Sequence, residues 1–329
     1  LPLIGTGDWN DGLNRVGSKG SGESVWLAWF LSTVYRDFAG VCDRMGDPDV
    51  AERYRQHADT LINQAEMVGW DGEWYLRAFD DDGQPLGSTD NEECKIDLNA
   101  QTWAVLAGTP NKSHQVQAMR SVEQHLMNGI VRLLAPPFQH SETNPGYIMG
   151  YPPGVRENGA QYSHAAAWAG WAYGALGDGD GALGVFHRLN PIKHTDSEAA
   201  VANYRVEPYA VAADIYGAPP YAGRGGWTWY TGASAWTYRL AVEVILGMRR
   251  RGQTLEINPC LPEDWDGYNA RLRFGESRYD IVVERGEGES DESHVCVDGI
   301  PLEGNAIELE RDGGLHDVLV TTTTSPLSR

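Results

Sequence analysis

The chain of 329 residues lacks features that would place it in several protein classes. No run approaches the roughly 18 apolar residues that a membrane-spanning helix needs, and no charged leader with an apolar core indicates a signal peptide. Its cysteines, Cys42, Cys94, Cys260 and Cys296, form no CxxC pair and are too widely separated to indicate a zinc site. We therefore expect free buried thiols in a reducing compartment, the cytoplasm, and no metal site.

Positive charge is also scarce. The 26 lysines and arginines face 46 aspartates and glutamates, which gives a formal net charge of -20. An acidic surface repels nucleic-acid phosphates and anionic membranes, so no nucleic-acid partner is expected. An anionic substrate would need a local cationic pocket.

Aromatic residues, in contrast, are plentiful, with 12 tryptophans and 15 tyrosines. Such rings often line carbohydrate-binding clefts because their flat apolar faces pack against the C–H bonds of sugars. Most aromatic side chains of any protein nevertheless fill its core. The length allows one large domain and a small one.

Apolar periodicity predicts a mainly helical region followed by a small β domain. Helices are predicted at residues 22–45, 48–67, 99–107, 113–127, 161–176, 181–189, 207–215 and 229–248. Strands are predicted at residues 74–79, 254–257, 270–274, 279–283, 295–297, 306–309 and 317–321. The change after residue 252 predicts two domains, 1–252 and 253–329. Paired helices with long loops on one side are typical of an α/α toroid, and the β-rich end is expected to be antiparallel.

A first group of residues suited to chemistry lies at 7–12 (Gly-Asp-Trp-Asn-Asp-Gly). Asp8 and Asp11 flank Trp9 shortly before a predicted helix. A carboxyl group beside an indole can give or take a proton while the ring holds a sugar. Carboxylates before a helix are more often N-caps or turn formers, and for Asp8 a structural role is the preferred interpretation.

A second group lies at 150–164, where prolines and glycines predict a fixed loop ahead of a helix. It brings Tyr151, Arg156 and Glu157 to the start of that helix. Helix N-termini attract anions, so His164 in the first turn could donate a hydrogen bond to phosphate. Each has a simpler interpretation: His164 as a satisfied helix-start histidine, and Arg156 with Glu157 as a loop-bracing salt bridge.

A third group lies at 225–236, which is rich in glycine and tryptophan. Its glycines let the backbone approach a ligand closely. Thr231 offers a hydroxyl and Gly232 a backbone N–H where a helix is predicted to begin. By itself this segment is equally well explained as a capped helix with a tryptophan core.

Together the three segments resemble the motifs of the inverting phosphorylases of the cellobiose/chitobiose type, glycoside hydrolase family 94. The similarity runs to about residue 281 and is greatest to the phosphorylase-like C-terminal part of cyclic β-1,2-glucan synthases. It implies the C-terminal part of an (α/α)6 toroid followed by a β-sandwich-like domain. It also implies that inorganic phosphate is the co-substrate and that no cofactor is needed.

The resemblance also implies a role for each candidate residue. Asp11 would be the general acid, and Trp9 a wall of the donor subsite. Phosphate would be bound by His164, Thr231 and Gly232, and the sugar region would include Tyr151, Arg156 and Glu157. In this family further segments precede the first motif. We therefore expect a fragment whose partner is the missing N-terminal part or a second copy, and whose incomplete toroid exposes apolar helix faces.

The implied reaction is phosphorolysis, or reverse synthesis, of a β-glucoside such as a β-glucan oligosaccharide, giving α-glucose 1-phosphate. Inverting hydrolases need two carboxyl groups, whereas phosphate is already a competent nucleophile, so one acid and an anion pocket suffice. Two alternatives stay open. One is an inverting hydrolase with Glu157 or another carboxylate as base. The other is a non-catalytic glycan-binding or length-controlling module of a glucan synthase.

Overall fold

A computed structural model describes residues 1–141, 143–229, 232–286 and 294–322. The chain forms two compact units. One unit comprises Leu1–Ala172 and Arg188–Ser234, and the other comprises Tyr173–His187 and Ala235–Arg329. The domain division at residues 252 and 253 remains a prediction.

Helices make up most of the regular structure, as predicted. Within the described residues the α-helices are α1 (Val25–Arg44), α2 (Pro48–Gly69), α3 (Leu98–Leu106), α4 (Lys112–Leu126), α5 (Ser163–Ala175), α6 (Gly179–Leu189), α7 (Glu198–Tyr204) and α8 (Ala233–Arg239). A π-helical segment, η3 (Leu240–Ile245), follows α8, and two short 3-10 helices are η1 (Asp11–Leu13) and η2 (Tyr147–Gly150).

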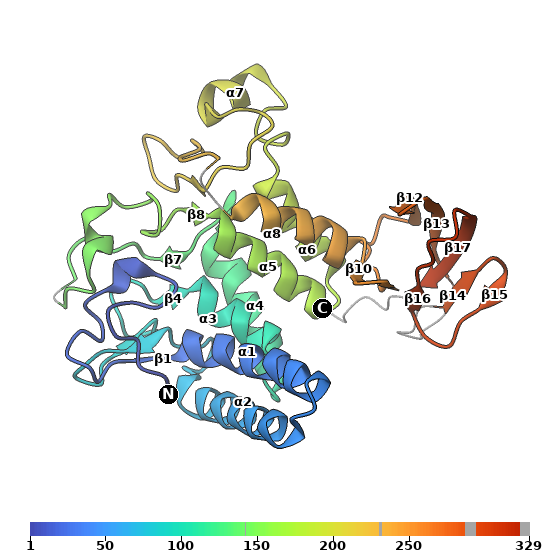
Figure 1. The fold of residues 1–329 in the computed structure, drawn as a ribbon. Helices are drawn as coiled ribbons and strands as arrows, with labels where there is room; N and C mark the ends of the chain where they lie inside the picture. Colours follow the sequence, from blue (N-terminus) through green and yellow to red (C-terminus); the bar gives the residue numbers. More distant parts are fainter. Residues whose placement is uncertain (142, 230–231, 287–293, 323–329) are drawn as a thin grey trace. The chain divides into compact units, whose positions relative to one another are not determined.

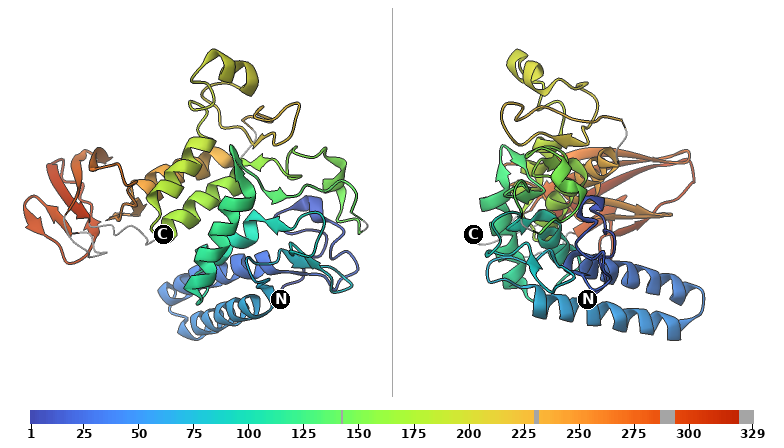
Figure 2. Two further views of the ribbon diagram at one scale, coloured as in Figure 1. Left: turned by 180° about the vertical axis from the view of Figure 1, so that it is seen from behind. Right: turned by 90° about the vertical axis from the view of Figure 1, so that its left-hand side faces the viewer.

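Capping residues explain where the pair α1 and α2 begins. The Ser24 hydroxyl accepts a hydrogen bond from the backbone N–H of Leu27 at 2.9 Å, and the Asp47 carboxylate accepts one from Val50 at 3.3 Å. Pro48 occupies the first position of α2, where its missing N–H costs nothing. The two helices lie side by side in Figures 1 and 2. The helices predicted at 22–45 and 48–67 are thus confirmed.

Very short strands join the loops of the first unit. They are β1 (Glu23–Ser24), β2 (Ala78–Phe79) and β3 (Pro85–Leu86) in one sheet, and the pairs β4 (Ile96–Asp97) with β7 (Leu134–Ala135), β5 (Met127–Asn128) with β6 (Ile130–Val131), and β8 (Gln161–Tyr162) with β9 (Asp214–Ile215). The β8–β9 pair places Tyr162 opposite Asp214. Because β8 runs directly into α5, this pair fixes the backbone at the start of that helix.

The strands of the second unit form two sheets. The first has the order β10 (Met248–Arg251), β11 (Thr254–Ile257), β16 (Ala306–Glu308), and the second the order β12 (Gly267–Phe274), β13 (Ser277–Arg285), β17 (Leu315–Thr322), β14 (His294–Val297), β15 (Ile300–Pro301). Alternating apolar residues, among them Ile281, Val283, Val318 and Val320, form a buried core. The predicted small β domain is confirmed, with one correction: β13 and β17 pair in parallel.

Two predicted elements differ from the structure. The predicted helix at 207–215 is absent from these described residues, where β9 is the regular element. Pro208 interrupts the start of this stretch, and the pairing of β9 with β8 holds its end extended. The strand predicted at 74–79 is reduced to β2, because the backbone N–H and carbonyl of Tyr75 bond the side-chain amide of Gln101, both at 2.8 Å, instead of a neighbouring strand.

The remaining expectations concern membranes and thiols. None of the described helices is long and apolar enough to cross a membrane. Cys42, Cys94 and Cys260 are free and buried, and Cys296 is free and half-buried. The expectation of free thiols is therefore confirmed.

Candidate functional site

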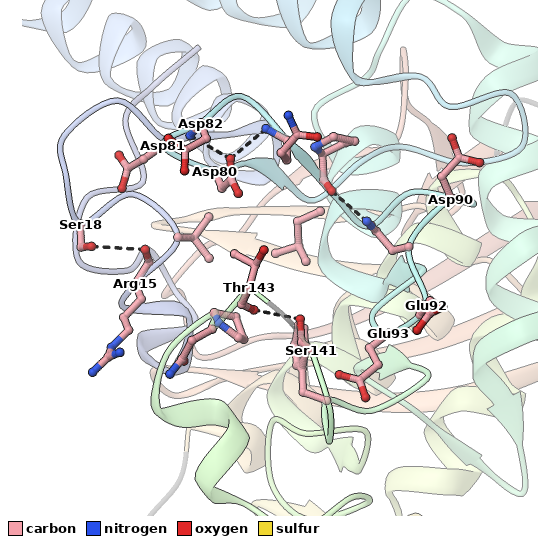
Figure 3. Close-up of a pocket in the computed structure, with 18 of the residues that line it drawn as sticks. Arg15, Ser18, Asp80, Asp81, Asp82, Asp90, Glu92, Glu93, Ser141 and Thr143 are labelled. Carbon is pink, nitrogen blue, oxygen red and sulfur yellow. Dashed lines mark hydrogen bonds between the residues drawn. The ribbon is translucent and has the colours of Figure 1, made fainter.

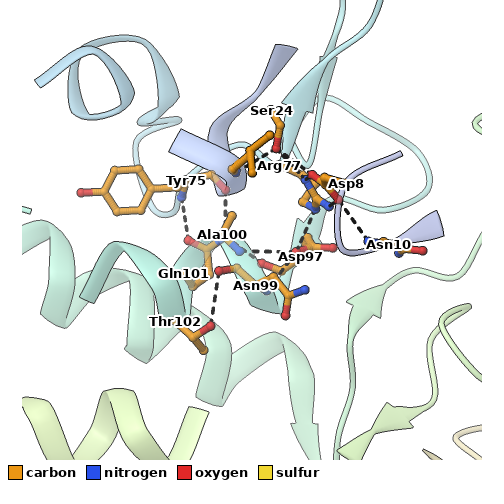
Figure 4. A network of polar contacts seen from close by, with 11 residues as sticks. Asp8, Asn10, Ser24, Tyr75, Arg77, Asp97, Asn99, Ala100, Gln101 and Thr102 are labelled. Atoms are coloured by element: carbon orange, nitrogen blue, oxygen red, sulfur yellow. Dashed lines mark hydrogen bonds and ion pairs between the residues drawn. The ribbon is translucent and has the colours of Figure 1, made fainter. Parts of the chain in front are cut away.

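Asp8 belongs to a network of polar contacts with Arg77 and Ser24 (Figure 4). Its carboxylate is buried and pairs with the Arg77 guanidinium at 2.5 and 2.7 Å, and it accepts a hydrogen bond from the Ser24 hydroxyl at 2.7 Å. Burial would raise the pKa of Asp8, but the charge and hydrogen bonds of Arg77 and the bond from Ser24 hold it below the ordinary value. Asp8 thus anchors the 7–12 segment to the start of α1, in agreement with its interpretation as a structural residue.

A second carboxylate shares this buried cation. Asp97 lies 3.5 Å from Arg77 Nε and caps α3 by accepting from the backbone N–H of Asn99 at 2.9 Å. Burial raises the pKa of Asp97 to about 6, with Arg77 opposing and Asp8 adding to the rise. Neither Arg77 nor Asp97 is predicted from the sequence. The available signal was a charged residue inside the apolar run at 74–79.

Asp11 begins η1 and is exposed. The buried Asn10 holds this turn by accepting a hydrogen bond from the Gly12 N–H at 3.1 Å. A Cβ on Gly12 would come within 2.9 Å of the Ile148 side chain, so η1 packs closely against η2. Burial and the charge of Asp11 both raise the pKa of Tyr147, which begins η2. Asp11 therefore lies on a turn that packs against the segment leading into the second group of candidate residues.

Trp9 connects the first group with the second. Its indole Nε1–H donates a hydrogen bond to Nδ1 of His164 at 3.3 Å. Its ring lies edge-on to Tyr162, with centroids 5.2 Å apart, and tilted against Trp168 at 5.5 Å. Burial lowers the pKa of His164 to about 4, so its imidazole is neutral at neutral pH.

Arg156 lies among aromatic rings. Its guanidinium is 5.3 Å from the ring centroid of Tyr151 and 4.8 Å from that of Trp227, both within cation–π range. Its Nε lies 3.6 Å from a carboxylate oxygen of Glu157. Burial raises the pKa of Glu157, and the charges of Asp214 and Asp11 add to the rise while Arg156 opposes it. Trp227 belongs to the third segment, but the sequence did not single it out.

Two buried polar residues hold this loop. The Asn158 side chain accepts from the Phe138 N–H at 2.7 Å and donates to the carbonyls of Phe138 and Tyr151, each at 2.8 Å. The Asp214 carboxylate accepts from the backbone N–H of Arg156 at 3.0 Å, where φ is +51°, and from that of Trp227 at 3.4 Å. Asp214 is not predicted from the sequence, because it falls in the helix predicted at 207–215.

The third group is described in part. Gly232 is exposed and lies directly before α8, whereas Thr231 lies outside the described residues. The structure therefore brings Trp9 and His164 into contact and gathers Tyr151, Arg156 and Glu157 in one loop. The meeting of these residues with Thr231 and Gly232 stays a prediction.

A pocket of about 620 Å³ lies beside these segments (Figure 3). It is lined by loops at 15–19, 80–93 and 138–145 and includes none of the candidate residues. Its many acidic groups are partly structural, because the Asp81 carboxylate accepts from the backbone N–H of Lys19 at 2.7 Å and of Ser21 at 2.8 Å. Among the described residues, no group of three or more His, Cys, Asp or Glu side chains could hold a metal ion.

The known proteins similar to this chain include a glucan synthase and glycoside phosphorylases. The chain is 47% identical over 300 residues to cyclic beta-(1,2)-glucan synthase NdvB of Rhizobium meliloti (strain 1021), which covers 90% of this chain and 11% of that protein. It is 31% identical to solabiose phosphorylase of Paenibacillus borealis, over 97% of this chain and 42% of that protein. It is 30% identical to N,N'-diacetylchitobiose phosphorylase of Vibrio proteolyticus, over 95% of this chain and 39% of that protein. The chain thus spans less than half the length of each relative.

A solved structure and two family models add to this result. A sialidase structure aligns with 82% of this chain and 24% of its own, with a TM-score of 0.57 and 14% identity, which is a likeness of fold alone. The C-terminal domain of glycosyl hydrolase family 65 matches residues 248–289. The catalytic domain of the glycosyl hydrolase 94 superfamily matches residues 1–247, most of the chain. The resemblance noted in the sequence is confirmed, and the chain belongs to the glycosyl hydrolase 94 superfamily.

Proposed function

We propose that this chain is the part of an inverting glycoside phosphorylase that supplies the acid and binds phosphate, on the C-terminal portion of an (α/α)6 toroid. Its substrate is a β-glucan oligosaccharide. Asp11 protonates the glycosidic oxygen while phosphate attacks the anomeric carbon from the opposite face, which yields α-glucose 1-phosphate without a metal or cofactor. Family membership and the phosphorylases among the relatives support this reaction.

The contact between Trp9 and His164 carries the proposal. It joins the segment that holds the acid to the segment expected to bind phosphate, through one hydrogen bond of 3.3 Å. Asp11, two residues after Trp9, is exposed and free to meet a substrate. Phosphorolysis needs one acid and an anion pocket, and in this proposal Thr231 and Gly232 complete the pocket.

The loop around Arg156 is proposed to hold the sugar chain. Tyr151 and Trp227 present ring faces for C–H contacts, and the Arg156 guanidinium between them can donate to sugar hydroxyls. Glu157 can accept hydrogen bonds from the same hydroxyls. The similarity to a cyclic β-1,2-glucan synthase favours a β-1,2 linkage.

Glu157 also motivates a second candidate, an inverting hydrolase. Its carboxylate is influenced by the charge of Asp11, and such an enzyme needs a second carboxylate to activate water. Phosphorolysis is preferred because the relatives include phosphorylases, and dependence on phosphate distinguishes the two reactions.

The test is an incubation with short β-1,2- and β-1,4-glucans, with and without inorganic phosphate. The chain and a longer form of the protein, where the gene encodes one, are assayed in parallel. We expect α-glucose 1-phosphate to form in the presence of phosphate. Free sugar released without phosphate would favour hydrolysis, and binding without turnover in both forms would favour a glycan-binding module.

Replacement of the acid gives the first prediction. Asp11→Asn should lower turnover by about 10² to 10⁴-fold, the range typical of a lost general acid. His164→Ala should raise the KM for phosphate. The control is Asp59→Asn, which breaks an exposed ion pair with Arg36 at 3.1 Å and should leave turnover unchanged. Normal turnover in Asp11→Asn would contradict the assignment.

A further inference from the structure

The hydrogen bond between Trp9 and His164 restricts the protonation of the imidazole. An indole N–H is a donor and never an acceptor. Since Trp9 Nε1–H points at Nδ1 of His164 at 3.3 Å, Nδ1 must offer its lone pair. A neutral imidazole carries one proton, which must then reside on Nε2.

The same geometry disfavours a second proton on the imidazole. Protonation of Nδ1 would place two N–H donors, that of Nδ1 and that of the Trp9 indole, opposite each other without an acceptor between them. The surroundings also oppose a charge, because Trp9 and Trp168 pack against the imidazole with ring centroids 5.7 and 4.6 Å away. Burial accordingly lowers the pKa of His164 to about 4.

We propose that Trp9 is a positioning residue that holds His164 in the Nε2–H tautomer and thereby makes Nε2 a hydrogen-bond donor to an oxyanion. The identity of that oxyanion as phosphate rests on the proposed function, but the tautomer does not. The wall of the donor subsite and the phosphate-binding imidazole then act as one unit, and the indole contributes to phosphate affinity without touching phosphate.

Imidazole nitrogen spectra test the tautomer directly. We would record long-range ¹H–¹⁵N correlations of the ¹⁵N-labelled protein at pH 7 without phosphate. The chain has nine histidines, so the His164 signals are assigned by their loss in His164→Gln. We expect a protonated nitrogen at Nε2 and an unprotonated one at Nδ1. A protonated Nδ1, or two nitrogens averaged between tautomers, would overturn the proposal.

The variant that removes the donor is Trp9→Phe. We expect both His164 nitrogens to shift towards the average of two exchanging tautomers. The matched control, Trp168→Phe, replaces the other indole that packs against His164 but keeps the Trp9 donor, so the Nε2–H tautomer should persist. An unchanged tautomer in folded Trp9→Phe would refute the role of Trp9. Should that variant not fold, 3-benzothienylalanine at position 9 keeps the two-ring shape and lacks the N–H.

Titration with inorganic phosphate separates this inference from the proposed function. We expect phosphate to shift Nε2 in the native protein and to bind roughly three- to tenfold more weakly to Trp9→Phe, the effect of one neutral hydrogen bond. If the tautomer depends on Trp9 but phosphate leaves Nε2 unmoved, Trp9 still positions His164, and the phosphate-binding role of His164 is wrong.

Discussion

At the scale of single residues, Arg77 is a buried cation shared by two buried carboxyl groups. A buried guanidinium is tolerated when it is paired, and Arg77 has two carboxylate partners, Asp8 at 2.5 Å and Asp97 at 3.5 Å. One cation cannot fully offset two anions, so one of the two carboxyl groups keeps its proton to a higher pH than usual. Asp8 is the closer partner and ionises readily, whereas burial raises the pKa of Asp97 to about 6.

This imbalance predicts a stability that changes with pH. The folded-state pKa of Asp97, about 6, lies above the ordinary 3.8, so between these values the folded state binds more protons than the unfolded state. The free energy of unfolding contributed by Asp97 therefore falls as pH rises through this window, by at most about 3 kcal/mol. Asp8, whose pKa is lowered, acts in the opposite sense and loses its stabilisation below about pH 4.

The variant that isolates the effect is Asp97→Asn, which resembles the protonated side chain and keeps an oxygen to cap α3. Its Tm relative to the native protein should increase between pH 5 and pH 7. Thermal melts at the two pH values measure this difference. A difference that is the same at both would show that Asp97 does not titrate in this range.

At the scale of elements, the loop at 151–158 depends on one amide. Asn158 is buried and its side chain makes three hydrogen bonds to the backbone of Phe138 and Tyr151, while Val155 and Asn158 close a turn with a backbone bond of 3.1 Å. The loop carries Arg156 in a left-handed conformation, with φ of +51°. Such a conformation persists where neighbouring contacts enforce it.

Truncation of this amide should destabilise the fold. Asn158→Ala leaves three backbone groups, two of them buried, without their partner, and we expect a loss of roughly 2–5 kcal/mol in the free energy of unfolding. Urea unfolding measures it. The control is Asn144→Ala in an exposed turn, where the side chain accepts from Gly146 at 2.9 Å and the expected loss is below about 1 kcal/mol. Equal losses would mean that the three bonds are not worth more than one exposed contact.

The sequence predicts elements well where local rules dominate. The helices α1 and α2 follow from apolar periodicity, and β11 follows from alternation between turn residues. The same rules fail at 207–215, because the conformation of this segment depends on the pairing of β9 with β8, which is distant in the chain.

The candidate site shows the same difference between local and long-range signals. Motifs identified Trp9 and His164, but no local pattern predicts the role of Asp214, whose carboxylate accepts a hydrogen bond from a backbone N–H 58 residues away.

At the scale of the whole molecule, α1 exposes an apolar stripe. Val34, Phe38 and Val41 of α1 and the C-cap residue Met45 recur at helical spacing, and their exposed fractions are 42%, 51%, 37% and 79%. Exposed apolar side chains that gather on one face favour association with another protein surface.

We therefore expect the isolated chain to self-associate through α1. Light scattering after size exclusion should show a mass that increases with protein concentration. Phe38→Lys should shift the population to monomer, and Ile192→Lys, at another exposed apolar residue, should not. A monomer at every concentration would exclude a second copy as the occupant of the stripe, and a longer form of the protein that remains monomeric would point to its own additional segment.

The hydrogen bonds of Asn158 also affect how fast this asparagine deamidates. An asparagine followed by glycine deamidates when the glycine backbone nitrogen attacks the side-chain amide carbon. Here the Gly159 N–H donates to the Glu157 carbonyl at 3.0 Å, and the Asn158 amide is held by its three bonds. The glycine nitrogen can therefore attack only when the loop opens. An aspartate formed at position 158 could still accept a hydrogen bond from the Phe138 N–H but could no longer donate to the carbonyls of Phe138 and Tyr151. The deamidated loop would then not recover its original conformation.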